Sequence, residues 1–191
     1  MDLVPSPSQT VGPFFHLGLT ANGALGCLAG PGAKGERIRL ACRVLDGDGA
    51  PVTDAMIELW QADAGGKYNH PDDTQEKAAD PAFRGFGRLP TNEDGACVFE
   101  TVKPGRVPGW DSRTLQAPHV NASVFARGLL KHLVTRIYFA GDPANQEDPV
   151  LALAPEDRRD TLMAHPDAEH PGVWNFEIHL RGERETVFFD V

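Results

Sequence analysis

Strict alternation of apolar and polar side chains is the feature that most limits how this chain can fold. Residues 174–180 carry Trp, Phe, Ile and Leu at every second position, and residues 38–44 repeat the pattern with Ile, Leu, Cys and Val. In an extended strand, successive side chains point to opposite faces. The pattern therefore predicts β-strands that each have one buried face.

Other segments fit the same interpretation. Further strands are predicted at residues 52–60, 97–101, 119–127 and 132–139. The 174–181 strand is expected to turn into a last strand at 186–189, which makes a hairpin. One short helix is expected at 155–163, because Pro and two acidic residues open it. We therefore predict a mainly β fold, an antiparallel β-sandwich or barrel.

The first 34 residues differ in composition from the rest. Residues 1–34 are rich in Pro, Ser and Gly and are predicted to form an extended arm, followed by a sandwich domain at 35–191. Within the arm, Phe14 and Phe15 follow a Gly-Pro turn. Two exposed aromatic rings are unfavourable in water, so we expect this part of the arm to dock on another surface.

Charge and cysteine content exclude several classes of function. The formal net charge is −9, whereas binding nucleic acid or an anionic membrane needs clustered Lys and Arg. Three cysteines without CxxC spacing describe neither a disulfide framework nor a zinc site. The first ten residues lack the pattern of a secretory signal, and no run approaches 18 apolar residues. We expect a cytoplasmic protein.

Two long connections and a histidine pair are the first candidates for a site. Residues 65–83 and 105–118 exceed normal hairpin loops, and such loops tend to carry sites or contacts. His119 and Asn121 lie two apart on a predicted strand, so their side chains share a face. A second His there would complete a metal pincer. Asn is a poor ligand for a transition metal, and a hydrogen-bonded polar pair is the alternative.

Arg127 ends the strand that begins at His119. The two residues lie eight positions apart, or roughly 26 Å along a straight strand. Arg127 is therefore not expected to serve a site at His119, although it could serve a site on a neighbouring chain. A surface or interface ion pair is the alternative interpretation of this arginine.

Seven segments of the chain, taken together, resemble one known family, the intradiol ring-cleavage dioxygenases. The resemblance covers nearly the whole chain and implies that family's β-sandwich. The matching segments are PSQTVGPF at 7–14, IELWQAD at 57–63, GFGR at 85–88, TVKPG at 101–105, APHVN at 117–121, FARG at 125–128 and TVFFD at 186–190.

The resemblance implies a ferric iron, Fe(III), held by two Tyr and two His. Carried over position by position, the first Tyr matches Tyr68 and the first His matches His119. Val107 stands where the second Tyr is expected, and Asn121 stands where the second His is expected. The resemblance therefore implies vestigial ligand positions and no metal held by this chain. Within the family, the chain is similar to an iron-free alpha subunit that works with an iron-bearing beta subunit.

The resemblance also assigns this chain a share in the beta subunit's site. It implies that Thr10, Gly12, Pro13 and Phe14 line the substrate pocket in the partner. It matches Arg127 to an arginine near the carboxylate of the substrate, protocatechuate. The implied reaction inserts oxygen between the two hydroxyl-bearing ring carbons and gives 3-carboxy-cis,cis-muconate. The implied assembly repeats αβ units.

Two other interpretations stay open at this point. One is an independent intradiol dioxygenase acting on catechol or hydroxyquinol, which needs the full ligand set that Val107 and Asn121 break. The other is a non-catalytic β-sandwich binding module, which the same loss of ligands would also fit. Bound iron in the isolated chain would favour the first, and a stable monomer without a partner would favour the second.

Overall fold

The computed structural model describes residues 9–12, 14–110 and 113–190. One short α-helix, α1 (Phe14–Leu19), opens the described chain. Four 3-10 helices follow: η1 (Gly23–Gly26), η2 (Pro143–Glu147), η3 (Leu151–Leu153) and η4 (Glu156–Leu162). The strands are β1 (Arg37–Leu45), β2 (Met56–Trp60), β3 (Phe86–Pro90), β4 (Ala96–Val102), β5 (Val107–Pro108), β6 (Leu115–Gln116), β7 (His119–Phe125), β8 (Leu133–Phe139), β9 (Met163–Pro166) and β10 (Val173–His179).

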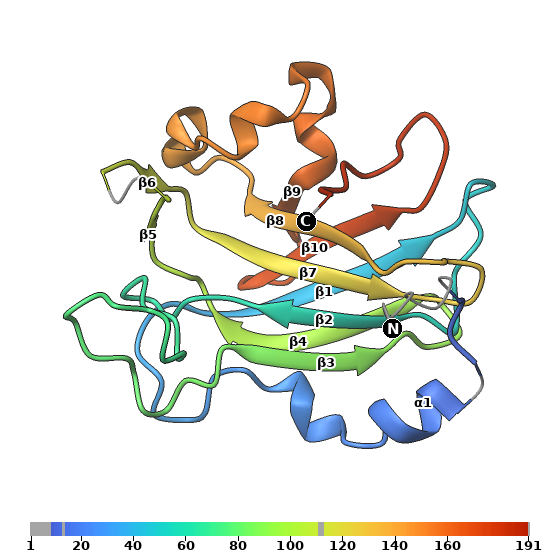
Figure 1. Cartoon of the computed structure of the whole chain (residues 1–191), viewed down its shortest axis with the longest axis horizontal. Helices are drawn as coiled ribbons and strands as arrows, with labels where there is room; N and C mark the ends of the chain where they lie inside the picture. The colour runs from blue at the N-terminus through green and yellow to red at the C-terminus, as the bar shows by residue number, and fades with distance from the viewer. Residues whose placement is uncertain (1–8, 13, 111–112, 191) are drawn as a thin grey trace, which may run out of the picture.

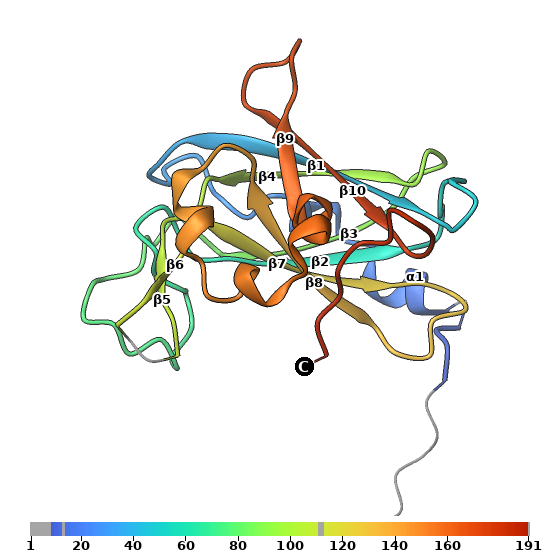
Figure 2. The same ribbon diagram turned by 90° about the horizontal axis from the view of Figure 1, so that it is seen from above.

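Eight strands form one hydrogen-bonded series that folds into two layers. Their order is β3-β2-β7-β8-β9-β10-β1-β4, and β5 pairs with β6 separately. The short β9 joins the layer of β3, β2, β7 and β8 to the layer of β10, β1 and β4 (Figures 1 and 2). The mainly β sandwich predicted from the sequence is therefore confirmed.

The alternating pattern defines the core between the layers. In β1, Ile38, Leu40, Cys42 and Val44 are buried, while the residues between them are exposed or half-buried. The opposite layer supplies the alternate residues of β7, of which Val120, Ala122 and Val124 are fully buried. Burying apolar area of this kind is the main source of stability for the sandwich.

Two features of strand pairing differ from the sequence prediction. β1 pairs with β10 in parallel, and β8 pairs with β9 in parallel, so the sandwich is mixed and not wholly antiparallel. The predicted hairpin at 186–189 is wrong. Phe189 instead forms a bridge with Val134 of β8. The tail crosses to β8 because Val187 and Phe189 pack there against a second apolar cluster around Tyr138 and Leu162.

The predicted helix and the predicted N-terminal arm also differ from the sequence prediction. The helix expected at 155–163 is the 3-10 helix η4, whose Leu162 is buried. The predicted arm is not extended throughout, because α1 and η1 form within it. Leu28 and Ala29 are fully buried; the Leu28 N–H donates to Glu100 O, and the Leu28 carbonyl accepts from the Arg84 N–H. The last part of the arm therefore packs in the core of the sandwich, because its apolar side chains have a face to bury.

Within the described part of the chain, none of the helices has the length and apolar character that crossing a membrane requires. The cytoplasmic location expected from the sequence stays a prediction.

Candidate functional site

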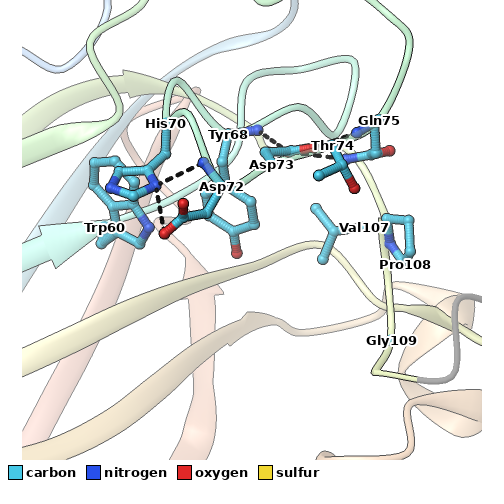
Figure 3. A pocket seen from close by; sticks show the side chains of 10 residues that line it. All are labelled: Trp60, Tyr68, His70, Asp72, Asp73, Thr74, Gln75, Val107, Pro108 and Gly109. Carbon is cyan, nitrogen blue, oxygen red and sulfur yellow. Dashed lines mark hydrogen bonds and ion pairs between the residues drawn. The ribbon is translucent and has the colours of Figure 1, made fainter.

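A pocket of about 660 Å³ opens where the two long connections meet. Tyr68, His70 and residues 72–75 of the first connection line it, together with 107–109 of the second and Trp60 at the end of β2. Figure 3 shows Trp60 and His70 close together, with Val107 and Pro108 at the other side of the pocket. The long loops therefore do shape a cavity, and it contains two of the four positions that the resemblance matches to iron ligands, Tyr68 and Val107.

The loop that carries Tyr68 is held by one ion pair and several hydrogen bonds. Lys67 Nζ lies 2.9 Å from Asp73 Oδ1, and both side chains are almost completely buried. Asp73 also accepts hydrogen bonds from the backbone N–H groups of Tyr68 and Gln75. Burial opposes ionisation of Asp73, but Lys67 and these N–H groups outweigh it and lower the pKa of Asp73 to about 2. The loop is thus fixed independently of any ligand in the pocket.

Tyr68 and Asn121 meet at the inner end of the pocket. The Tyr68 ring stacks on Trp60, with centroids 5.8 Å apart and planes inclined by 13°. The Asn121 amide lies 3.5 Å from the Tyr68 hydroxyl and also donates to Trp60 O. Burial raises the pKa of Tyr68, although Arg136 and Asn121 oppose the shift. Tyr68 is therefore a neutral phenol at neutral pH.

His119 is buried beside this pair and turned toward its own backbone. Its Nδ1 lies 2.8 Å from Ala117 O. Because a carbonyl oxygen only accepts, Nδ1 carries the proton of the neutral ring. Burial, reinforced by the nearby Arg136 cation, lowers the pKa of His119 to about 4. The side chain is thus a neutral imidazole at physiological pH.

Arg136 connects the four positions that the resemblance matches to iron ligands, and no sequence motif points to it. It lies directly opposite Asn121 in the β7–β8 ladder, and its charge acts on both Tyr68 and His119. Its Nη1 donates to Gln116 Oε1 at 2.6 Å, and Gln116 pairs with Val107. The signal in the sequence is an arginine within the mostly apolar run of β8.

This arrangement does not fit the ferric site that the resemblance describes. Val107 offers only an aliphatic side chain, and Asn121 donates an amide N–H toward the Tyr68 hydroxyl. A guanidinium cation already acts on both remaining ligand candidates, and iron would have to bind against that charge. Across the described ranges, no group of three or more His, Cys, Asp or Glu side chains could hold a metal ion.

The depressed pKa of His119 makes stability depend on pH in a defined window. The unfolded chain binds the proton near pH 6.5, but the folded chain only near pH 4. Acidification between these values therefore favours unfolding, and the stability is fully present above pH 6.5. We expect His119 to contribute a loss of about 3 kcal/mol in unfolding free energy between pH 6.5 and 4.

Urea unfolding at a series of pH values measures this effect. His119→Gln should flatten the acid side of the profile. The control His165→Gln should keep the wild-type profile, because His165 is more than half exposed. An unchanged profile in His119→Gln would contradict the assignment.

Two of the residues predicted to contact the substrate, Arg127 and Thr10, lie near the C-terminal end of β7. Arg127 lies two residues beyond the last residue of β7, the strand that His119 begins. The backbone N–H of Gly128 donates to Thr10 Oγ1 at 2.7 Å, across 118 positions of sequence. The described start of the arm therefore lies beside Arg127. Arg127 itself forms an ion pair with Asp54, the alternative considered for it above.

The other arm residues lie near this point with their apolar surface uncovered. Gly12 accepts a backbone hydrogen bond from Phe15, whose ring lies 5.7 Å from Phe125. Phe14 is 79% exposed and Leu17 is 72% exposed. Pro13 lies outside the described residues. Apolar side chains of this size exposed together on one short helix are typical of a protein–protein contact.

Comparison with known proteins gives consistent matches. A family model described as Dioxygenase matches residues 11–182. The protocatechuate 3,4-dioxygenase alpha chain of Burkholderia cepacia is 42% identical over 202 residues, which cover 99% of this chain and 98% of that protein. The beta chain from the same organism is 38% identical over 158 residues, or 80% of this chain and 67% of that one.

A solved structure has the same type of fold. It is the dioxygenase domain of a dioxygenase carbohydrate-binding protein fusion from Streptomyces sp. SirexAA-E. The match has a TM-score of 0.63 at 26% identity, and covers 94% of this chain and 99% of that one.

Proposed function

The chain belongs to the intradiol ring-cleavage dioxygenase family, and we propose that it is the alpha subunit of a protocatechuate 3,4-dioxygenase. The observation that carries the proposal is the altered donor set around Arg136. Intradiol dioxygenases are iron enzymes, yet Val107 and Asn121 replace two ligands and a guanidinium acts on the other two. In this proposal, the Fe(III) is bound by a beta subunit with which the chain forms αβ units.

The proposed reaction is oxygen insertion between the hydroxyl-bearing carbons of protocatechuate, giving 3-carboxy-cis,cis-muconate. The iron, bound in the partner, would supply the chemistry of substrate and oxygen activation. This chain would supply recognition and closure of the substrate pocket. Thr10, Gly12, Pro13 and Phe14 would form part of the pocket wall, and Arg127 would bind the substrate carboxylate.

The exposure and chemistry of Arg127 support its proposed role in substrate recognition. Arg127 has a largely exposed guanidinium, with 73% of its side chain accessible. A guanidinium fork matches a carboxylate with two parallel hydrogen bonds, which a substrate entering a partner's pocket could accept. The net charge of −9 would otherwise repel an anionic substrate, so a local cation is needed.

The exposed face of α1 supports a partner next to this group. Phe14 and Leu17 would be buried against the beta subunit, which would bring the arm and Arg127 to the partner's pocket. Burial of two such side chains contributes about 1.5–3 kcal/mol each to association before ordering costs.

Expression of the chain alone and together with the iron-bearing subunit tests the proposal. We expect iron and oxygen uptake with protocatechuate only in the co-purified complex, measured by metal analysis and an oxygen electrode. Stoichiometric iron with turnover in the lone chain would favour an independent dioxygenase. A stable monomer that ignores the iron-bearing subunit would favour a binding module.

A further inference from the structure

Arg127, which follows β7, pairs with Asp54, a residue to which the proposed function assigns no role. Arg127 Nε donates to Asp54 Oδ2 in a close ion pair. The Asp54 side chain is 26% exposed, whereas that of Arg127 is 73% exposed. The acid is thus the more fixed partner, and the arginine extends outward from it.

Strand register explains why these two residues meet. β2 and β7 are antiparallel with Met56 opposite Phe125, so Asp54 and Arg127 face each other just beyond the ladder. The next residue, Ala55, is fully buried, its N–H donates to Thr91 Oγ1, and its carbonyl accepts from the Thr91 N–H. The backbone that carries Asp54 is therefore held by the core. The anchor is rigid even though it lies at the surface.

We propose that Asp54 is a positioning residue for carboxylate recognition by Arg127. This inference rests on the proposed function of Arg127. Among the described residues, the ion pair engages Nε of Arg127, which leaves the edge formed by Nη1 and Nη2 for a second carboxylate. An unanchored exposed arginine samples many rotamers, and ordering it on binding lowers affinity. Asp54 removes that cost because it fixes the plane of the guanidinium beforehand.

Asp54 could also act in the opposite direction, because its negative charge repels a substrate carboxylate. Salt screens exposed charges only beyond about 8–10 Å at physiological ionic strength, so this repulsion persists across a single guanidinium. Positioning acts through the direct contact with the arginine. The two effects make different predictions for neutral replacements: positioning depends on an acceptor at Oδ2, whereas repulsion depends on the charge alone.

Steady-state kinetics of the complex with the iron-bearing subunit separates them. With protocatechuate, Asp54→Ala should raise the KM by about three- to tenfold at nearly unchanged kcat. Asp54→Asn keeps an acceptor oxygen and should stay within about twofold of wild type. Asp54→Ser, polar but too short to reach Nε, should behave like Asp54→Ala and serves if the alanine variant does not assemble.

Two further measurements distinguish positioning from a structural role. The double variant Asp54→Ala/Arg127→Ala should have the KM of Arg127→Ala alone, because Asp54 acts only through the arginine. Inhibition by 4-hydroxybenzoate should weaken in Asp54→Ala, while inhibition by phenol, which lacks the carboxylate, should not change.

The possible outcomes separate this inference from the function on which it rests. A raised KM in Arg127→Ala with an unchanged or lowered KM in Asp54→Ala overturns positioning alone and leaves the role of Arg127 intact. A KM that is unchanged in Arg127→Ala overturns both. A raised KM in Asp54→Asn equal to that in Asp54→Ala would also overturn positioning through the acceptor.

Discussion

Replacing Arg127 with alanine is expected to raise the KM for protocatechuate by about ten- to one-hundredfold in the complex. The reason is the loss of the proposed charge-assisted hydrogen-bond pair to the substrate carboxylate, which would contribute about 1.5–3 kcal/mol. The iron content should not change, because in the proposed complex the beta subunit holds the iron and Arg127 contacts only the substrate. Metal analysis and steady-state kinetics on the same preparation measure both quantities.

Arg43→Ala provides a matched control for this variant. Arg43 is an exposed arginine on β1, and it also makes a hydrogen bond through Nε, to the backbone oxygen of Asp94. Its removal should leave the KM unchanged. If Arg127→Ala also leaves the KM unchanged, Arg127 does not bind the substrate carboxylate, and the observed ion pair with Asp54 becomes its whole role.

Asp148→Ala is expected to have the largest effect on stability, a loss of about 3–5 kcal/mol in unfolding free energy. Asp148 is only 1% exposed. Its carboxylate accepts hydrogen bonds from the N–H groups of Ala117, Val150 and Leu151 and from the Tyr138 hydroxyl, at 2.6–3.0 Å. An alanine would leave four donors unpaired in the interior, each at a cost of about 1–3 kcal/mol before relaxation.

Urea unfolding followed by tryptophan fluorescence measures this loss. The control is Asp94→Ala in the exposed turn before β4, which should change stability by less than about 0.5 kcal/mol. Asp148→Asn should fall between wild type and Asp148→Ala, because it keeps one acceptor oxygen. A loss below about 1 kcal/mol in Asp148→Ala would mean that water satisfies the four donors.

Asp148 is also linked to His119 through Ala117. It fixes the backbone of Ala117, and Ala117 O in turn orients the His119 ring. Tyr138, the other partner of Asp148, lies directly opposite His119 in the β7–β8 ladder. Asp148 therefore helps to hold the start of β7, where His119 lies.

The strands and the core could be predicted from the sequence. The alternation in residues 38–44 and 174–180 depends only on neighbouring positions, and a period of two specifies a strand with one buried face wherever it pairs. The departures from the ferric ligand pattern, at Val107 and Asn121, depend only on the donor chemistry of the two side chains, and their assignment stays a prediction.

The tertiary structure decided which strands pair and which distant residues meet. The same alternation fits a parallel or an antiparallel neighbour, so the β1–β10 pair and the path of 186–189 could not be read from it. The meeting of Thr10 with Gly128 spans 118 positions, and that of Asp54 with Arg127 spans 73.

Arg136 shows the physical reason most clearly. Sequence marks it as a charged residue in an apolar strand, but its effect on Tyr68 and His119 requires the β7–β8 register and the loop that carries Tyr68. Periodicity is a local property of the chain and survives in any arrangement of strands. Electrostatic and hydrogen-bond partners depend on distances across the fold, which are determined only when the two layers pack.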